Sequence, residues 1–362
     1  MISQKRVYFF FFFQYMRIWV ILLFIVPASL FGQHIDVFPN LQGNELLDSI
    51  RMSYTPESTL GYSKARDTLF RNILAVNNVI ECIYTDWTIT LDPSKDPTDF
   101  AYNLNINTEH IYPQSKGAQF EPMRSNMYNL YSVRENVNTD RGNDPFGEIP
   151  DDKTEWWYYK DKKQKEIPSS DIELYSEKGN SLFEPKENRK GDVARSIMYF
   201  YTIYQSTCDG IDPNYFTLMS EDLCKWHIAD PVDTDEWNRN ILISAYQNNK
   251  TNPFILDCTI PQRSYCAGTG LFCTPTNSSK GRMAITPLKI YPSTGSAGTT
   301  IHLDSSIPIA KLLVLDSSGK KVDFDYINQD NLILKNTTKG IFFIFSLDQE
   351  GRFNGYAKFI MI

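Results

Sequence analysis

Residues 107–143 bring together side-chain types that could act jointly on a phosphodiester. The chain has four histidines, and one of them, His110, directly follows Glu109. Asn138 and Arg141 follow within the reach of one further loop and helix. Metal-assisted cleavage of a phosphodiester needs a base, oxygen ligands for a hard cation and a positive charge beside the phosphate. The residue types in this stretch meet those three needs.

Backbone geometry limits how these residues can share one site. Neighbouring side chains on a regular strand point to opposite faces, so Glu109 and His110 can meet only at a strand end or an irregularity. On a predicted helix, Asn136 and Asn138 are two positions apart and face different ways, so one alone can face His110. Arg141 lies three positions after Asn138, can share its face, and could contact the phosphate.

The stretch resembles the endonuclease I family of secreted nucleases, a branch of the ββα-metal (His-Me finger) group. Later blocks at residues 183–195 and 223–254 also match the family, so the resemblance covers roughly residues 65–257. It implies an α+β fold with a His-Me finger catalytic domain.

The resemblance also implies a role for each residue of the site. His110 is the general base, for which a neutral imidazole is suited near neutral pH. Glu109 and Asn138 hold one divalent cation, either Mg²⁺ or another hard cation such as Mn²⁺ or Ca²⁺. The family has a phosphate-contacting arginine between the base and the metal-binding asparagine, and Arg124 is the only arginine within residues 113–133.

The N-terminus reads as an export signal. Lys5 and Arg17 precede the apolar run 18–26, and small or neutral residues follow it, so we expect a signal peptide over residues 1–32. The true start could be Met16, because Met16 and Arg17 alone could begin a complete signal peptide. An N-terminal membrane anchor is the alternative, but the clean apolar run is short for a membrane span.

Six cysteines agree with an oxidising compartment. No Cys-x-x-Cys motif occurs, which argues against a zinc ribbon. We expect at least one local bridge among Cys258, Cys266 and Cys273. Cys208 with Cys224 is a second candidate pair.

The net charge of -7 argues against a generally basic nucleic-acid-binding surface, although a local basic cleft remains compatible with it. Lysines cluster within residues 153–165, which we interpret as a solvated surface. A second basic run within residues 186–195 either lines a nucleic-acid groove or pairs with acidic residues.

From residue 284 onward, short apolar strands alternate with Gly, Asp, Asn and Ser turns, a pattern typical of a small β-sandwich. We place the catalytic domain at 33–275, a linker at 276–285 and the sandwich at 286–362. The sandwich resembles the C-terminal sorting domain of type IX secretion substrates. An accessory carbohydrate- or protein-binding sandwich is the alternative. The matching residues are 288–292, 316–320, 339–343 and 358–359.

Apolar periodicity predicts the remaining elements. We expect Asp192 to cap the helix at 193–205, and His227 to be a packed residue rather than a ligand. The expected elements are helices at 44–52, 62–77, 193–205 and 234–247, strands at 79–91 and 106–112, a loop at 92–103, and a strand-like turn with a helix start at 126–138.

Together these features predict a secreted or surface-located, monomeric, Mg²⁺-dependent, non-specific endonuclease acting on extracellular DNA and possibly RNA. The late β-sandwich would engage the secretion machinery. An extracellular ribonuclease is the first alternative, because the chemistry at phosphate is shared. A non-catalytic surface binding protein is the second, and the joint presence of Glu109, His110 and Asn138 argues against it.

Overall fold

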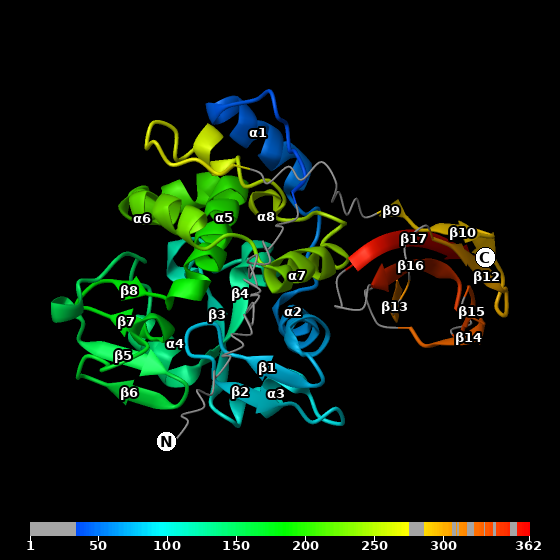
Figure 1. Cartoon of the computed structure of the whole chain (residues 1–362), viewed down its shortest axis with the longest axis horizontal. Helices are drawn as coiled ribbons and strands as arrows, with labels where there is room; N and C mark the ends of the chain where they lie inside the picture. Colours follow the sequence, from blue (N-terminus) through cyan, green and yellow to red (C-terminus); the bar gives the residue numbers. More distant parts are fainter. Residues whose placement is uncertain are drawn as a thin grey trace, which may run out of the picture. The chain divides into compact units, whose positions relative to one another are not determined.

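The computed structural model describes residues 34–274, 286–305, 309, 311–316, 322–328, 330–335, 338–347 and 353–362 (Figure 1). The expected signal peptide at 1–32 and linker at 276–285 lie outside these residues. Across the described ranges, no helix has the length and apolar character needed to span a membrane. We call residues 34–274 the N-terminal region and residues 286–362 the C-terminal region.

Each region has its own buried apolar cluster. One cluster draws on residues between Val37 and Cys266, and the other on residues between Leu288 and Met361. The N-terminal region is helical with small sheets, whereas the C-terminal region is rich in strands. The predicted mixed α+β class is therefore confirmed at this level.

Helix α5 (Lys190–Ile211) forms the centre of the N-terminal region. Its side chains are buried without a break from Lys190 to Tyr204, so the helix is covered on all sides. Figure 1 shows α5 beside the helices that pack against it. These neighbours are α1 (Gly43–Tyr54), α6 (Tyr215–Ala229) and α8 (Pro253–Leu256).

A strand pair followed directly by a helix lies in the first half of the region. β3 (Ile106–His110) pairs antiparallel with β4 (Leu130–Arg134), and His110 stands opposite Leu130. α4 (Glu135–Arg141) starts at the residue after β4 and contacts both strands. The expected strand over 106–112 and the helix start within 126–138 are confirmed, and β3 ends at His110.

The helix expected at 62–77 is present as α2 (Tyr62–Thr68) continued by the π-helical turn η1 (Leu69–Leu74). The helices expected at 44–52, 193–205 and 234–247 are confirmed, the last as α7 (Thr234–Ser244).

Two predictions around residues 79–103 are wrong. The single strand expected at 79–91 is a hairpin of β1 (Val79–Glu81) and β2 (Thr88–Thr90), with Asp86 at φ 53° in its turn. Aspartate tolerates this left-handed conformation better than most residues. The loop expected at 92–103 contains α3 (Pro97–Tyr102), which Asp96 caps through the amides of Thr98 and Asp99.

Asp192 is not the cap of α5, which also corrects the prediction. The helix begins two residues earlier, at Lys190, so Asp192 lies in its first turn and accepts a hydrogen bond from Arg189. Helix α6 and a four-stranded sheet are not among the elements predicted from the sequence. That sheet consists of β6 (Lys162–Gln164), β5 (Trp156–Tyr159), β7 (Ser176–Lys178) and β8 (Phe183–Glu184).

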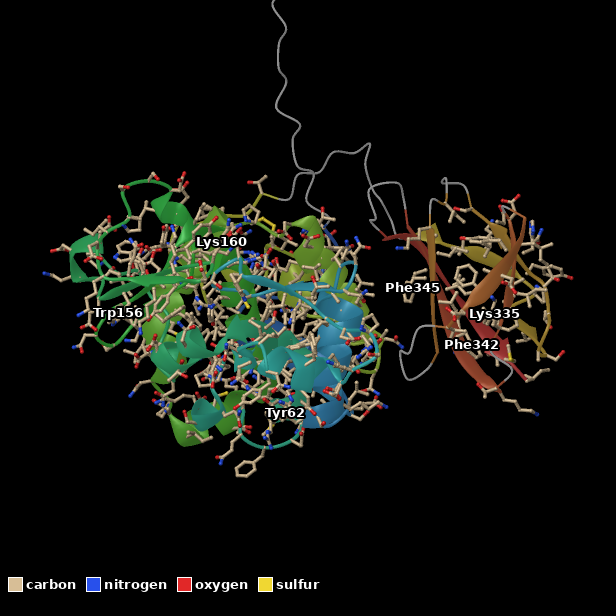
Figure 2. All side chains as sticks on the ribbon, turned by 90° about the horizontal axis from the view of Figure 1, so that it is seen from below. Tyr62, Trp156, Lys160, Lys335, Phe342 and Phe345 are labelled. Carbon is tan, nitrogen blue, oxygen red and sulfur yellow. A yellow bond between two sulfur atoms is a disulfide. The ribbon has the colours of Figure 1, made fainter. Side chains whose placement is uncertain are left out.

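The C-terminal region contains two sheets whose inward side chains share one apolar cluster. Strand β12 alternates buried and exposed residues. Phe342, labelled in Figure 2, and Ile344 of β16 are buried. One sheet has the order β10 (Lys289–Tyr291), β12 (Ile301–Asp304), β15 (Asn331–Leu334), β14 (Phe324–Asn328). The other has β11 (Thr294–Gly295), β17 (Phe353–Met361), β16 (Gly340–Leu347) and β13 (Lys311–Asp316), with β9 (Thr286–Pro287) also paired to β17.

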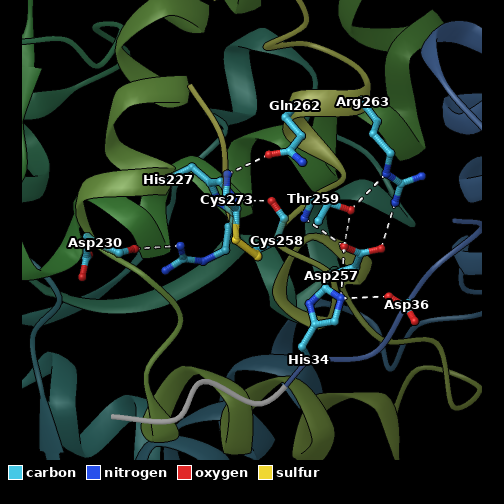
Figure 3. Close-up of a disulfide and its surroundings, with 11 residues drawn as sticks. His34, Asp36, His227, Asp230, Asp257, Cys258, Thr259, Gln262, Arg263 and Cys273 are labelled. Atoms are coloured by element: carbon cyan, nitrogen blue, oxygen red, sulfur yellow. Dashed lines mark hydrogen bonds and ion pairs between the residues drawn. A yellow bond between two sulfur atoms is a disulfide. The ribbon is translucent and has the colours of Figure 1, made fainter. Parts of the chain in front are cut away.

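Two disulfides join cysteines of the N-terminal region. Cys258–Cys273 is the local bridge that the sequence predicts, and Figure 3 shows its surroundings. Cys224 pairs with Cys266 rather than with Cys208, so the second predicted pair is wrong. Cys208 is a buried free thiol on α5, and its sulfur lies against the loop at Gly117.

Candidate active site

His110 lies at the end of β3 with both ring nitrogens in defined contacts. Its Nε2 is 3.0 Å from the backbone carbonyl of Arg124, and a carbonyl can only accept a hydrogen bond. Nε2 therefore carries the proton. Gln114 donates its side-chain amide to Nδ1 over 3.4 Å. The tautomer that these contacts select leaves the lone pair on Nδ1, where it can take a proton.

The surroundings of His110 keep the imidazole neutral. The residue is only 5% exposed. Burial lowers the pKa of His110 to about 4, and the positive charges of Arg124, Arg141 and Arg66 act in the same direction. A base must be unprotonated before it acts, so the ring is ready to accept a proton across the neutral range.

Glu109 is buried beside His110 and is held by two donors on one oxygen. Its Oε1 accepts from the hydroxyl of Tyr84 at 2.8 Å and from Nη1 of Arg141 at 3.2 Å. Burial raises the pKa of the Glu109 carboxyl, whereas Arg141 and the Tyr84 hydroxyl lower it. The ion pair favours a carboxylate whose orientation is fixed before any ligand arrives.

Arg141 points into the interior, where it is 1% exposed. Besides Glu109, it donates to the carbonyls of His110 at 3.1 Å and Ile111 at 2.9 Å, and to the hydroxyl of Tyr215 at 3.3 Å. The guanidinium that we expected beside a substrate phosphate thus binds the backbone at the end of β3 instead. The structure gives it a positioning role for Glu109 and His110.

Helix α4 carries both asparagines that the sequence offers as metal ligands. Asn138 precedes Arg141 by three positions, so helical periodicity places it on the same side of α4 as Arg141, whereas Asn136 is five positions away and faces differently. Within the described ranges, neither of the two side-chain amides makes a hydrogen bond. On its other side, α4 is fastened by Asp140, which accepts from Tyr158 and Lys163 of the β5–β6 hairpin.

The residues present suit a hard, hydrated cation. Glu109 offers a preoriented carboxylate and Asn138 an amide oxygen without a partner in the described structure, which are ligands that Mg²⁺ accepts while it keeps several waters. The described residues contain no group of three or more His, Cys, Asp and Glu side chains placed to hold a metal. A site of one carboxylate, one amide and water would not form such a group.

Arg124 belongs to a cluster with Tyr62 and Arg66, of which the sequence predicts only Arg124. It lies in the 3₁₀ turn Met123–Ser125, with its guanidinium carbon 4.2 Å from the centre of the Tyr62 ring. Tyr62, labelled in Figure 2, has its ring centre 5.4 Å from that of His110. Arg66 stacks on the same tyrosine at 4.6 Å. Tyr62 and Arg66 are one turn apart on α2, which is the only signal in the sequence that links them.

Three of the four cations in the second basic run, Lys186, Lys190 and Arg195, are buried. All four cations form ion pairs with acidic residues, so of the two alternatives for this run the structure supports pairing with acids. The pairs are Lys186–Asp86, Arg189–Glu81, Lys190–Glu184 and Arg195–Glu236. The lysines of the first run, from Lys153 to Lys165, are exposed as expected.

His227 is a packed residue, as the sequence predicts. It is 3% exposed, and its Nε2 donates to the carbonyl of Cys258 at 2.9 Å (Figure 3). No acidic side chain is among its hydrogen-bond partners in the described structure. It therefore contributes to the packing around the Cys258–Cys273 bridge rather than to the site at His110.

Residues 44–259 match the Endonuclease I family. The match spans more than half of the chain and contains every residue of the site described above, so the chain belongs to this family. The chain is also 31% identical over 164 residues to an extracellular ribonuclease from Bacillus amyloliquefaciens. That alignment covers 41% of this chain and 50% of the relative, so the chain spans about half the length of the curated relative it matches.

Proposed function

We propose that this protein is a secreted, Mg²⁺-dependent endonuclease that hydrolyses phosphodiester bonds in DNA and RNA without sequence specificity. The observation that supports it most is the tautomer of His110, whose protonated Nε2 faces a carbonyl and whose Nδ1 carries the lone pair, with the Gln114 amide 3.4 Å away. Membership of the Endonuclease I family and the similarity to an extracellular ribonuclease agree with a nuclease.

The order β3, β4, α4 supports a His-Me finger arrangement, in which two strands and a helix hold a base and a cation. His110 ends the first strand, and the helix that follows the second strand carries Asn138. The base and the two metal ligands thus come from adjacent elements of one small unit. Arg141 ties that unit together through its contacts with Glu109 and the end of β3.

The proposed reaction begins with a water molecule beside Nδ1 of His110. The water attacks the phosphorus in line, and Nδ1 takes its proton as the new P–O bond forms. The bond from phosphorus to the 3′-oxygen breaks, its electron pair leaves with that oxygen, and solvent supplies the proton. Arg124 offsets the charge of the phosphate. A cation held by Glu109 and Asn138 supplies Lewis-acid stabilisation when it is bound.

A ribonuclease is the second candidate, favoured by the name of the Bacillus amyloliquefaciens relative. Attack on phosphorus by an activated water needs no 2′-hydroxyl, so the same site can act on both polymers. Incubation of the purified mature protein with plasmid DNA and with RNA, each with Mg²⁺ or with excess EDTA, separates the candidates. We expect cleavage of both with Mg²⁺ and of neither with EDTA. Binding of either polymer without cleavage would support the non-catalytic alternative.

The metal ligands are tested by the Mg²⁺ concentration that gives the half-maximal rate. Glu109→Ala and Asn138→Ala should each raise this concentration, because each removes an oxygen ligand. Asn136→Ala is the matched control, since it lies on the same helix but on a different face. If Asn136→Ala raises the concentration and Asn138→Ala does not, the assignment of the ligand on α4 is wrong.

Export and domain organisation belong to the same proposal. We propose that residues 1–32 direct passage through the inner membrane and that the β-rich residues 286–362 engage a type IX machinery for release or surface display. The catalytic domain is residues 33–275, acting as a monomer. The separate apolar clusters of the two regions support this division.

A further inference from the structure

Two arginines beside His110 differ from the other arginines of the described structure. Arg66 and Arg124 make no side-chain hydrogen bond and no ion pair within the described ranges, and their Nε atoms are buried without a partner. The other described arginines all donate to a carboxylate or a carbonyl; they are Arg51, Arg71, Arg134, Arg141, Arg189, Arg195, Arg239 and Arg263.

The acidic residues closest in sequence to this pair are engaged elsewhere. Asp67, next to Arg66, accepts from the hydroxyl of Thr98. Glu121, three residues before Arg124, accepts from the backbone amide of Tyr62 at 3.1 Å and from a serine hydroxyl. Two half-buried guanidinium groups without a counter-charge are costly to hold together. Such a pair is expected where a ligand brings the negative charge.

The Tyr62 ring orders both cations without using their hydrogen-bonding capacity. Their guanidinium carbons lie 4.6 Å and 4.2 Å from the ring centre, within the range of cation–π contact. Neither contact uses an N–H donor, so the Nη groups of both arginines carry no protein partner within the described residues. Guanidinium N–H donors match the geometry of phosphate oxygens.

The position of the pair relative to the base identifies its ligand. Arg124 is the arginine that the proposed function assigns to the scissile phosphate, and its backbone carbonyl holds Nε2 of His110. Arg66 comes from a different element, α2, which packs against the turn that carries Arg124. A nucleic-acid strand carries one phosphate for each nucleotide. A strand bound with one phosphate at Arg124 therefore presents the neighbouring phosphate to a second cation nearby.

We propose that Arg66, ordered by Tyr62, binds the phosphate adjacent to the scissile one, so that the enzyme selects strands with two consecutive phosphodiesters. This inference rests on the proposed nuclease function and adds to it a specificity-determining residue. It predicts discrimination by the number of phosphates rather than by base sequence, because phosphate contacts position a strand without reading it.

The test compares two substrates that differ by one phosphodiester. Thymidylyl-thymidine has one, the thymidine trimer has two, and the matching uridine compounds serve if the enzyme prefers RNA. We expect the wild-type full chain to show a kcat/KM at least about tenfold higher for the trimer than for the dimer. This ratio corresponds to about 1.4 kcal/mol from the contact with the second phosphate. In Arg66→Ala this ratio should fall to within about twofold of unity, since the second phosphate has lost its partner.

Arg71→Ala is the matched control. It removes an arginine from the helical turn that continues α2, but that arginine donates to the carbonyls of Pro93 and Lys95. The ratio should stay at the wild-type value in this variant. Circular dichroism and thermal unfolding check that all variants fold. If Arg66→Ala does not fold, Arg66→Lys serves as a second variant.

The outcomes separate the inference from the proposed function. Cleavage of neither substrate nor of a long polymer by the wild type would overturn the proposed function itself. Equal kcat/KM values for both substrates in the wild type, or an unchanged ratio in Arg66→Ala, would overturn the inference alone. If Arg66→Ala lowers kcat/KM by the same factor on both substrates, Arg66 contacts the scissile phosphate instead. That result would also overturn the inference.

A binding measurement gives an independent second readout. In an inactive His110→Ala background, the affinity for single-stranded DNA is measured against salt concentration. The logarithm of the binding constant falls by about 0.7 per phosphate neutralised on a single strand for each tenfold rise in salt. Arg66→Ala should reduce that slope by about this amount, and Arg71→Ala should leave it unchanged. An unreduced slope in Arg66→Ala would contradict a phosphate contact.

Discussion

The N-terminal region buries charges, whereas the described part of the C-terminal region buries none. Arg141 and Arg195 are each 1% exposed, and each pairs with a buried glutamate. The C-terminal cluster is built from apolar side chains such as Leu303 and Phe342. An ion pair of that region, Lys335–Asp325, is exposed at 54% and 68%.

The difference shows where the chain is under functional constraint. A buried ion pair contributes little net stability, because the loss of hydration offsets much of its attraction. An interior that contains such pairs is therefore better explained by the geometry it fixes than by the stability it provides. At the candidate site, that geometry is the orientation of Glu109 and the backbone at His110. Five predictions test this contrast between the regions.

The largest effect is expected from His110→Ala. The variant should lose about 10²–10⁴ in the rate of cleavage, the usual contribution of a general base, while it folds and binds nucleic acid. Single-turnover cleavage of plasmid DNA measures the rate, and circular dichroism checks the fold. The control is His227→Asn, which alters another buried histidine outside the site. Wild-type activity in His110→Ala would contradict the assignment of the base.

Breaking a buried ion pair should give the next largest effect. Arg195→Met leaves Glu236 uncompensated in the interior and should lower the free energy of unfolding by about 3–5 kcal/mol. Adding Glu236→Leu should restore much of that loss. Tryptophan fluorescence during urea unfolding reports this region alone in the mature chain, because its tryptophans are at 87, 156, 157, 226 and 237.

The matching change in the C-terminal region is Lys335→Ala. Both partners are exposed and screened by solvent, so the free energy of unfolding should stay close to that of the wild type. Far-UV circular dichroism follows this variant, since the C-terminal region has no tryptophan. If Arg195→Met and Lys335→Ala lowered the free energy of unfolding equally, the two interiors would not differ in their dependence on buried charge.

The two regions also differ in how much of them the sequence predicts. In the C-terminal region, apolar alternation identifies β12, β13, β15, β16 and β17, because one face of each strand is buried. In the N-terminal region, the residue types alone predict Glu109 and His110 as site residues. Backbone geometry predicts that the two lie at a strand end or an irregularity, because neighbouring side chains on a regular strand face opposite ways. The base and the expected ligands were accessible because they lie within one short stretch.

Tertiary contacts account for what the sequence did not predict. Tyr62 and Arg66 reach the site only because α2 packs against the turn at Arg124, and nothing local signals that contact. The pairing of Cys224 with Cys266 likewise depends on how α6 meets a distant loop. The helix α6 itself was detectable, since Phe216, Met219 and Leu223 are buried at helical spacing.

A moderate, pH-dependent effect is expected at His227. Burial lowers its pKa to about 3 in the folded protein, against 6.5 as the ordinary value. Between these values the unfolded state holds a proton that the folded state lacks, so stability falls as the pH falls. The wild type should lose about 2 kcal/mol more than His227→Asn between pH 7 and pH 5. Urea unfolding at both pH values measures the difference, and parallel losses in the two proteins would contradict it.

The smallest effect on activity is expected from removing the C-terminal region. Every residue of the candidate site lies within 44–259, and the N-terminal region has its own apolar cluster and both disulfides. A chain ending after residue 274 should therefore fold, keep its kcat/KM within about twofold, and unfold with an unchanged tryptophan-monitored transition. In the native host, the same truncation should leave the enzyme in the periplasm, which fractionation with activity assays would show. Normal release of an active truncated enzyme would refute the sorting role. An inactive truncated enzyme would show instead that the catalytic fold requires the β-rich region, and the contrast between the two interiors would then lie within one domain.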